Sequence, residues 1–501
     1  MPTTENGPPV EQVVAAPTYM ADIRFFFRPQ DVEHMAAKGG IELGTYEGVK
    51  ENALAIVAHT TPPNGDMPPD AEGKWSAERL QTFRNWIING YPVGAATPVE
   101  PPPAAQPPIR LRKDITTLSD AEFDKLTAAF NGLMARDPGD PNSYFALAGQ
   151  HGLPKKKCAH LEDRFNPWHR KYLRVFEDAL RSVPGCEEVT LPYWDIATAL
   201  PVRLQNPPLD KYVLPADPGA AAHPPVTGFF PYTTERFPAA DIARNVTEFG
   251  VLVQVTTSLN QSLWGSFNVG GYQKFSIQAH DNGHGSIGPT MGNQRVSAFD
   301  PVFWFFHCNI DRLWLSWQTR VGATTIAGFK TTLGEGAGWF TGPLRNQLDP
   351  FGVTVDQVIE PQASYDRLEL VSPVEGAMEN LTGNIDAART FAFRSDSPVS
   401  VRVKGIDRLN IPGSFIVSLL ADGEPVAKQF FFQSDEPRTC EGCVNHGLVN
   451  IDFRMSQQKL LDRTLTVRID VPGHTGEIGT AFPLSRAGNP TINARLLVQE
   501  A

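Results

Sequence analysis

The sequence predicts a multidomain protein with a mainly α-helical core, a small helical N-terminal domain and a C-terminal domain of antiparallel β-strands. First, seven of the 11 histidines fall at positions 151–307, where several segments have the helical spacing of apolar residues, and six of the seven form two triplets. Second, a Pro-rich stretch at 98–108 separates this core from the preceding chain. Third, after about residue 375 the apolar residues recur at every second position. We therefore expect domains at 1–97, 109–372 and 373–501, with 98–108 as linker.

The N-terminal domain shows helical periodicity at 46–59 and 76–89. Ser76 is a suitable N-cap for the second helix, and Asn89-Gly90 is a typical stop signal. The Pro-rich stretch that follows cannot hold a helix and is expected to be a semi-rigid spacer. We expect the domain to pack on the core, and a role in covering the mouth of a functional site is the alternative.

The histidines of the core form two triplets, and the second opens with an i, i+4 pair. Residues four apart on a helix project from the same face, so His280 and His284 can bind one ion. Each triplet then needs a histidine from another helix. Pro167 suits the first turn of a helix that carries His169, and residues 300–314 are typical of a buried helix that carries His307. The triplets are His151, His160 and His169, and His280, His284 and His307.

Two adjacent metal ions, each bound by three imidazoles, are the simplest interpretation of these triplets. Neutral imidazole suits copper, which has the highest affinity of the divalent series for nitrogen sites. No Asp or Glu stands at a ligand position, which favours redox chemistry over hydrolysis. His223, in a Pro-rich loop, is the alternative to His151 as a ligand. The other histidines lack a partner at ligand spacing and are expected at the surface or at helix caps: His34, His59, His446 and His474.

The C-terminal domain consists of short runs of β-branched and aromatic residues, with Asp422-Gly423 as a strong hairpin turn. The pattern predicts an antiparallel sandwich or barrel. The runs are Thr390–Arg394, Val399–Val403, Phe415–Leu420, Lys428–Phe432, Val449–Phe453 and Thr464–Ile469.

Composition excludes several classes of function. With 44 basic and 55 acidic residues, the chain has a net charge of −11, and its sequence shows no basic stripe that could bind nucleic acid. Residues 1–16 lack the apolar run of a signal peptide, and no segment approaches membrane-spanning length. The five cysteines, at 158, 186, 308, 440 and 443, are too few and too unevenly placed for a disulfide framework. We therefore expect a cytoplasmic protein that binds neither nucleic acid nor membranes, and its oligomeric state stays open.

Several separated motifs together resemble the type-3 copper proteins, meaning tyrosinases, polyphenol oxidases (catechol oxidases) and hemocyanins. The resemblance covers roughly residues 110–370. It implies a core built on a four-helix bundle, with copper A at the first triplet, copper B at the second and dioxygen as co-substrate. The motifs are His151-Gly152-Leu153-Pro154, Cys158-Ala159-His160, Pro167-Trp168-His169-Arg170, Leu191-Pro192-Tyr193-Trp194-Asp195, the His280/His284 pair, and Asp300-Pro301-Val302-Phe303-Trp304 running on to His307, Asn309, Asp311 and Arg312.

The same resemblance suggests roles for residues around the histidines. Cys158 would be joined to His160 by a thioether bond, as in fungal tyrosinases and molluscan hemocyanins, and an ordinary thiol is the alternative. Arg170, Asn309 and Asp311 would support the ligands, with Arg170 and Asp311 paired across the bundle.

The C-terminal domain carries two further implications of the resemblance. In latent enzymes of the family such a domain shields the copper site with one inserted side chain. Cys440-Glu441-Gly442-Cys443 is similar to the motif with which some fungal tyrosinases take up copper, which implies a copper donor protein as partner. A local disulfide or an unremarkable thiol pair is the alternative.

The family oxidises o-diphenols to o-quinones, and tyrosinases also hydroxylate monophenols. Tyrosinases usually orient a water with a Glu before the first copper-B histidine and an Asn after it. Here residues 275–279 contain no Glu and Asp281 follows His280, so Asp281 is the candidate base or a ligand-supporting acceptor. Asn293 and Gln294 would line the substrate mouth.

We therefore expect an oxidase of small phenols, acting on o-diphenols or o-aminophenols with weak monophenol hydroxylation. The alternatives are a latent tyrosinase with true monophenolase activity and a hemocyanin-like dioxygen-binding protein.

Overall fold

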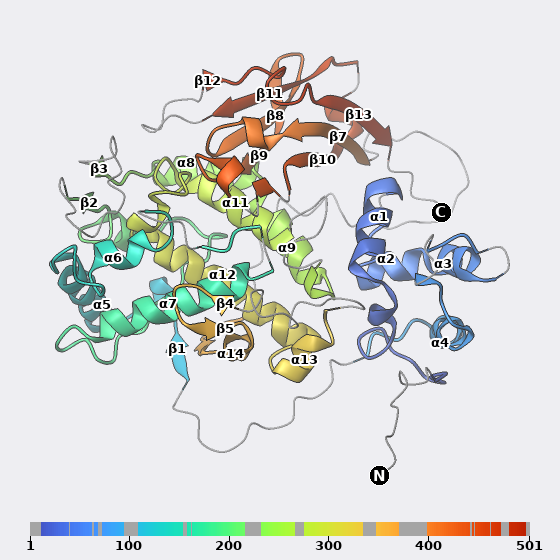
Figure 1. Ribbon diagram of the computed structural model, residues 1–501, viewed down its shortest axis with the longest axis horizontal. Coiled ribbons are helices and arrows are strands. Elements are labelled where there is room, and N and C mark those ends of the chain that lie inside the picture. The colour runs from blue at the N-terminus through green and yellow to red at the C-terminus, as the bar shows by residue number, and fades with distance from the viewer. Residues whose placement is uncertain are drawn as a thin grey trace, which may run out of the picture.

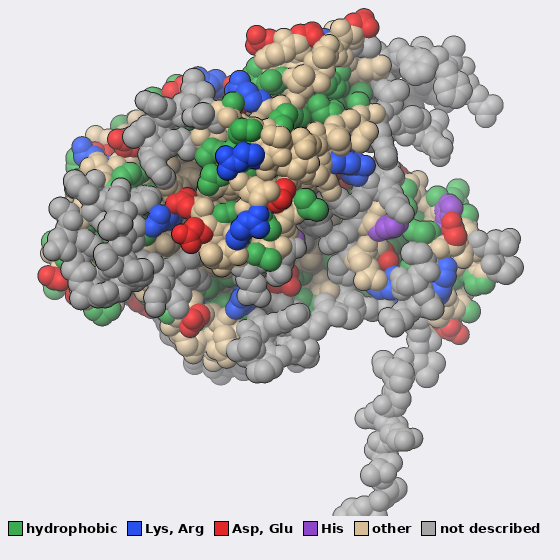
Figure 2. All heavy atoms as spheres, turned by 45° about the horizontal axis from the view of Figure 1, so that its top comes forward, with side chains coloured by type: hydrophobic (Ala, Val, Ile, Leu, Met, Phe, Trp, Pro, Cys, Tyr) green, Lys and Arg blue, Asp and Glu red, His purple; other side chains and the backbone are tan. Residues whose placement is uncertain are grey.

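The computed structural model describes residues 12–39, 41–62, 65–68, 73–94, 109–153, 158–161, 163–215, 232–265, 275–333, 347–369, 398–440, 443–444, 446–460, 462–471 and 480–496. A helical N-terminal module lies beside a larger helical core, and a β domain covers another side of that core (Figure 1). On the face drawn in Figure 2, acidic and basic side chains are interspersed, in keeping with the absence of a basic stripe from the sequence.

The N-terminal module consists of η1 (Ile23–Phe26), α1 (Pro29–Gly39), α2 (Tyr46–Glu51), α3 (Ala53–Thr60) and α4 (Ala77–Ile88). Ser76 caps α4 as predicted, because its side chain accepts the N–H of Arg79. The helix expected at 46–59 is two helices, broken at Asn52, whose side chain donates to the carbonyl of Gly48. The module packs on the core, where the Tyr19 hydroxyl lies 2.9 Å from the Ser262 hydroxyl.

The core is mainly helical, and its short strands lie between the helices. Its helices are α5 (Asp120–Met134), α6 (Tyr144–Gly149), α7 (Phe165–Arg181), α8 (Ala239–Glu248), α9 (Val251–Asn260), α11 (Phe275–Ile287), α12 (Val302–Val321), α13 (Ile326–Lys330) and α14 (Asp356–Ile359), with 3-10 turns η3 (Ile115–Thr117), η4 (Val202–Gln205) and η6 (Ser297–Phe299). Its strands are β1 (Arg110–Arg112), β2 (Val213–Leu214), β3 (Tyr232–Thr233), β4 (Gln347–Leu348), β5 (Val353–Thr354) and β6 (Ala363–Tyr365).

Helices α7 and α12 form the centre of the core. On α7 the aromatic residues Phe165, Trp168, Tyr172 and Phe176 recur three or four positions apart and are buried, as expected for one apolar helix face. Helix α12 is buried along nearly its whole length. The two helices meet through the stacked rings of Phe176 and Trp304, whose centroids are 3.5 Å apart. No helix among the described residues has both the length and the apolar character needed to cross a bilayer.

The β domain is a sandwich of two antiparallel sheets with its own apolar core. One sheet has the order β10-β7-β13 and the other β12-β11-β8-β9. The described strands thus form two open sheets, so the barrel alternative was wrong. The strands are β7 (Pro398–Asp407), β8 (Phe415–Ala421), β9 (Glu424–Phe431), β10 (Leu448–Ser456), β11 (Leu465–Val471), β12 (Thr480–Ala481) and β13 (Thr491–Leu496), with η8 (Arg408–Asn410), η9 (Pro437–Thr439) and η10 (Gln457–Lys459) between them.

The hairpin expected at Asp422-Gly423 joins β8 to β9. Both turn residues have positive φ, 52° and 84°, which a two-residue hairpin of this type requires. The strand expected at 390–394 lies outside the described residues. Strands β12 and β13 were not anticipated, because both are short or largely polar.

Candidate metal centre

The second histidine triplet comes together where α11 meets α12. His280 and His284 lie one turn apart on α11, with ring centroids 4.4 Å apart, and His307 approaches from α12. One ligand atom from each of the three lies within 4.8 Å of the others. Gly283 and Gly285 permit this contact, because rings of neighbouring segments stand within 2.5 Å of where their Cβ atoms would be.

The first triplet lies against the second. His169 of α7 stacks on His307, with centroids 4.4 Å apart and an interplanar angle of 11°. His151 and His160 come from the loop after α6, and their centroids are 5.0 Å apart. Ligand atoms of His151, His160 and Cys158 lie within 4.8 Å of one another. All six histidines are at most 3% exposed, so the structure brings every predicted ligand into one buried cluster.

Main-chain carbonyls fix the orientation of two of these rings. Nδ1 of His169 donates to the carbonyl of Phe165 over 2.8 Å, and Nδ1 of His284 donates to that of Met291 over 2.6 Å. Because a carbonyl only accepts, each Nδ1 carries the proton and each Nε2 is left with a lone pair. This is the tautomer that binds a metal ion through Nε2.

The buried nitrogens that lack partners fit a metal pair. Nε2 of His151, His169 and His280 is buried without a hydrogen-bond partner, which is costly for a polar atom. Nε2 atoms of His284 and His307 face each other at 3.1 Å, where a shared cation would satisfy both lone pairs. Imidazole donors without carboxylate ligands suit copper and other late transition metals rather than Mg²⁺ or Ca²⁺.

Burial keeps these imidazoles neutral. It lowers the pKa of His169 and His280 to about 3, and for His169 the neighbouring His280 adds to the effect. Burial, followed by the neighbouring histidines, lowers the pKa of His151, His284 and His307 well below the usual value. The neutral form is the one that binds metal.

Acidification should therefore destabilise the metal-free protein. The unfolded chain takes up protons on these histidines below about pH 6.5, whereas the folded state resists protonation until far lower pH. The contribution of these histidines to the free energy of unfolding should not vary with pH above pH 7. Below that, the free energy of unfolding should decline as the pH drops through 6. Urea titrations of chelator-treated protein between pH 5 and 8 would measure it. A flat profile over that range would contradict the burial of neutral imidazoles.

The predicted pair of Arg170 and Asp311 is present and joins α7 to α12. Nε of Arg170 donates to Asp311 over 2.6 Å, and Arg112 of β1 donates to the other carboxylate oxygen over 3.2 Å. Tyr365 donates to the same oxygen over 2.6 Å. Glu177 forms an ion pair with Arg112 and so balances the charge of this second arginine. Sequence reasoning missed Arg112, Glu177 and Tyr365, since only the fold brings β1 and β6 to this point.

Other predicted residues have the following positions. Asn309 accepts from Arg312 over 3.0 Å, and its role in supporting the ligands stays a prediction. Sγ of Cys158 lies 3.3 Å from Nδ1 of His160, a contact compatible with the predicted thioether, which also stays a prediction. His223 and His474 lie outside the described residues. His59 is a surface residue that pairs with Asp66.

Cys440 and Cys443 form a buried pair of thiols in the β domain. Their sulfur atoms are 2.7 Å apart. Arg408 is fully buried near them, and burial lowers its pKa while the two cysteines and Asp281 raise it. The predicted role of this pair in copper delivery is not tested by these contacts.

A phenylalanine from the β domain fills the space beside the histidines. The ring of Phe432 stacks on His284 with a centroid distance of 4.2 Å and an angle of 22°. It meets His160 and His280 edge-on at 5.2 and 5.5 Å. This residue was not singled out from the sequence. The available signal was the run Phe430-Phe431-Phe432, in which alternate residues of one strand must face away from the β domain's own core.

Strand β9 lies against α11 (Figure 1), and two side chains of α11 hold the Phe432 segment that follows this strand. The N–H of Phe430 donates to Asn282 over 2.9 Å, and the N–H of Phe432 donates to Asp281 over 3.3 Å. The other oxygen of Asp281 accepts from Nδ1 of His280 over 2.9 Å. Asp281 thus links a histidine of the centre to the segment that covers it.

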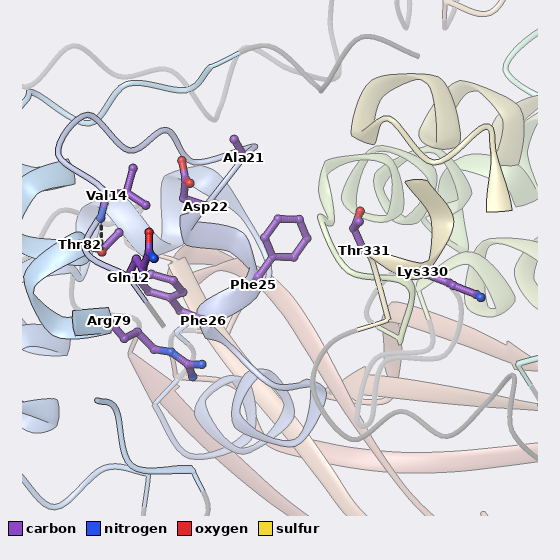
Figure 3. A pocket seen from close by; sticks show the side chains of 10 residues that line it. All are labelled: Gln12, Val14, Ala21, Asp22, Phe25, Phe26, Arg79, Thr82, Lys330 and Thr331. Atoms are coloured by element: carbon purple, nitrogen blue, oxygen red, sulfur yellow. Dashed lines mark hydrogen bonds between the residues drawn. The ribbon is translucent and has the colours of Figure 1, made fainter. Parts of the chain in front are cut away.

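The two residues predicted at the substrate mouth differ in position. Asn293 is partly exposed and its side chain accepts the N–H of Arg295. Gln294 is 3% exposed and lies against His160. A cavity of about 370 Å³ lies elsewhere, between the N-terminal module and α13, where Phe25 and Thr331 lie on opposite sides (Figure 3). At the histidine centre, the ring of Phe432 packs directly on His284.

Comparison with known proteins agrees with this geometry. The model of the common central domain of tyrosinase matches residues 141–227 and 231–320. Hemocyanin 1 of Megathura crenulata is 32% identical over 225 residues, 42% of this chain and 6% of that protein. Tyrosinase of Podospora anserina is 25% identical over 322 residues, 48% of this chain and 55% of that protein. The chain thus covers only 6% of the length of this hemocyanin and 55% of the length of this tyrosinase.

Solved structures show the same fold. A tyrosinase from Burkholderia thailandensis superimposes with a TM-score of 0.52 and 19% identity, covering 77% of this chain and all of that one. A functional unit of octopus hemocyanin superimposes with a TM-score of 0.52 and 17% identity, covering 77% of this chain and 99% of that one. Residues 141–320, which contain both histidine triads, therefore match the tyrosinase central domain found in type-3 copper proteins, and the two triads fit copper A and copper B.

Proposed function

We propose that this protein is a latent dicopper oxidase that converts o-diphenols to o-quinones or o-aminophenols to o-quinone imines. The observation that carries the proposal is the ring of Phe432, which lies flat on His284 between the triads and so occupies a space the size of a phenol. When bound, the copper pair supplies two one-electron acceptors and passes the electrons to dioxygen. Two o-diphenols each lose two electrons and two protons, and one dioxygen becomes two waters.

The chain itself would bind and orient the substrate. With the Phe432 segment withdrawn, a phenol ring can stack on His284 in its place, since both rings are flat, apolar and of similar area. Phe303 and Phe306 form apolar walls near His284, with centroids at 6.0 and 5.2 Å, and they exclude water from the ring. Withdrawal also frees the oxygen of Asp281 that accepts the N–H of Phe432, and this oxygen would take the substrate proton.

Oxygen consumption by the copper-loaded protein tests the proposal. Catechol, o-aminophenol and a monophenol are compared before and after limited proteolysis that removes the β domain. We expect little turnover before cleavage, and after it turnover of catechol and o-aminophenol well above that of the monophenol. Absence of turnover with all three, despite two bound copper ions after cleavage, would overturn the oxidase proposal.

A dioxygen-binding protein is the second candidate, because Phe432 blocks phenols and because part of the chain is 32% identical to a hemocyanin. Reversible oxygen uptake without substrate turnover, in both the intact and the cleaved protein, would favour it.

Replacing Asp281 with asparagine tests its proposed role as base. Asn retains an oxygen for the N–H of His280, so copper content should not change, but it accepts protons far less readily. In a Phe432→Ala background, which removes the effect of the covering ring, monophenol oxidation should fall about 100-fold relative to diphenol oxidation. Loss of copper instead would show that Asp281 supports the ligands.

A further inference from the structure

The geometry points to Gln294 as a positioning residue for copper A. We propose that Gln294 sets the metal-binding nitrogen of both His151 and His160, one through its carbonyl and the other through its side chain. The proposal rests on copper binding by the histidines and is independent of the substrate of the oxidase.

Gln294 comes from the loop between α11 and α12, which carry the second triad, yet it contacts the first. Its amide nitrogen lies 2.5 Å from Nδ1 of His160, and its carbonyl oxygen lies 3.3 Å from Nδ1 of His151. The side chain is 3% exposed, so water does not substitute for either contact. One residue of the copper-B half therefore touches two ligands of the copper-A half.

The loop is held against the first triad by close packing. A Cβ on Gly152 would stand 2.3 Å from the carbonyl oxygen of Gln294 and 2.6 Å from Cα of Arg295, so only glycine fits after His151. The loop also turns tightly, since the N–H of Val296 donates to the carbonyl of Asn293 over 3.1 Å. The position of Gln294 relative to His151 is thus fixed by main-chain contacts.

These contacts select one tautomer of each ring. At His151 two oxygen atoms lie near Nδ1, the main-chain carbonyl of Gln294 at 3.3 Å and the Ser297 hydroxyl at 3.2 Å. The carbonyl only accepts and the hydroxyl can also accept, so Nδ1 carries the proton and Nε2 has the lone pair. For His160 the partner is an amide, whose oxygen and nitrogen exchange places by rotation of the terminal group. With copper on Nε2 of His160, the amide presents its oxygen to the N–H at Nδ1. A second-shell acceptor of this kind raises the basicity of the ligand.

The anchor of His160, like that of His280, is a side chain that a substitution can remove. His169 and His284 donate to main-chain carbonyls, which no substitution removes. At His160 the acceptor is a side chain, and Sγ of Cys158 at 3.3 Å from Nδ1 is a much weaker acceptor. Loss of the amide would let the buried imidazole adopt the opposite tautomer, with a proton directed at the metal position.

Two variants of the full-length protein test the proposal. Gln294→Met keeps the length and volume of the side chain without a strong acceptor, whereas Gln294→Glu supplies a carboxylate oxygen to the N–H of His160. Chelator competition should show a 10- to 100-fold weaker affinity for one of the two copper ions in Gln294→Met and near wild-type affinity in Gln294→Glu. A residue that only fills space would give the reverse order, because methionine is the better apolar filler and a buried carboxylate is costly.

Nitrogen NMR of histidine-labelled, metal-free wild-type protein gives a second readout that needs neither variant nor activity. We expect His151 and His160 to carry their protons on Nδ1. A proton on Nε2 of His160, or unchanged affinity for both copper ions in Gln294→Met, would overturn the proposal.

Discussion

Replacing Phe432 with alanine should raise the rate of catechol oxidation by the intact copper-loaded protein about 10- to 100-fold. The ring is 1% exposed and stacks on His284. Burial of such a ring contributes about 1.5–3 kcal/mol to the closed state, and each 1.4 kcal/mol corresponds to a factor of ten in an equilibrium. Copper content should stay the same, because Phe432 supplies no ligand atom. Initial rates of oxygen uptake and copper analysis of the same samples would measure both quantities.

Phe430→Ala is the matched control for this prediction. Phe430 lies two residues earlier, on β9, and packs against α11, with its ring beside Gly285, but among the described contacts its ring meets Phe249 and none of the six histidines. The control should therefore change the rate much less than Phe432→Ala. Equal activation by both variants would mean that the docking of the whole β domain, rather than the Phe432 ring, limits access.

Asp311→Asn should lower the free energy of unfolding by about 3–5 kcal/mol. The carboxylate is buried between Arg170 and Arg112, so its removal leaves the buried charge of Arg170 without its carboxylate partner, while Arg112 keeps Glu177. Because these contacts join α7 to α12, which carry His169 and His307, copper should also dissociate faster. Urea unfolding of the metal-free protein would give the stability change, and chelator challenge the dissociation rate.

Asp178→Asn is the control for the charge change itself. Asp178 also pairs with an arginine, Arg110, but its side chain is 51% exposed. Its replacement should cost less than about 1 kcal/mol. A similarly small loss of unfolding free energy in Asp311→Asn would contradict the prediction that the buried network stabilises the fold.

Four of the six predicted ligands lie in local helical patterns, whereas His151 and His160 come from a loop and were assigned from the motifs around them. The i, i+4 spacing of His280 and His284 is a property of one helix, and the aromatic residues around His169 and His307 mark two buried helices before any tertiary contact is known. The hairpin at Asp422-Gly423 is local in the same sense, and it was confirmed.

Features that depend on pairing between distant segments were not predictable. Phe432 lies 148 positions after His284 in the sequence. The alternation of apolar residues along a strand shows which residues share a face, but it does not show against which other segment that face packs. The choice between sandwich and barrel depends on which edge strands pair, which the runs themselves do not encode. Gln294 was assigned to a substrate mouth by its place in the motif order, whereas the structure buries it on His160.

Copper content of the full-length protein after equilibrium dialysis tests the central claim most directly. The structure predicts two copper ions per chain, and fewer than two in both His169→Ala and His307→Ala, which remove one ligand from each triad. His59→Ala, at the exposed histidine paired with Asp66, should retain both ions. A single copper ion in the unaltered protein, or two ions retained in both triad variants, would contradict a dicopper centre formed by these six histidines.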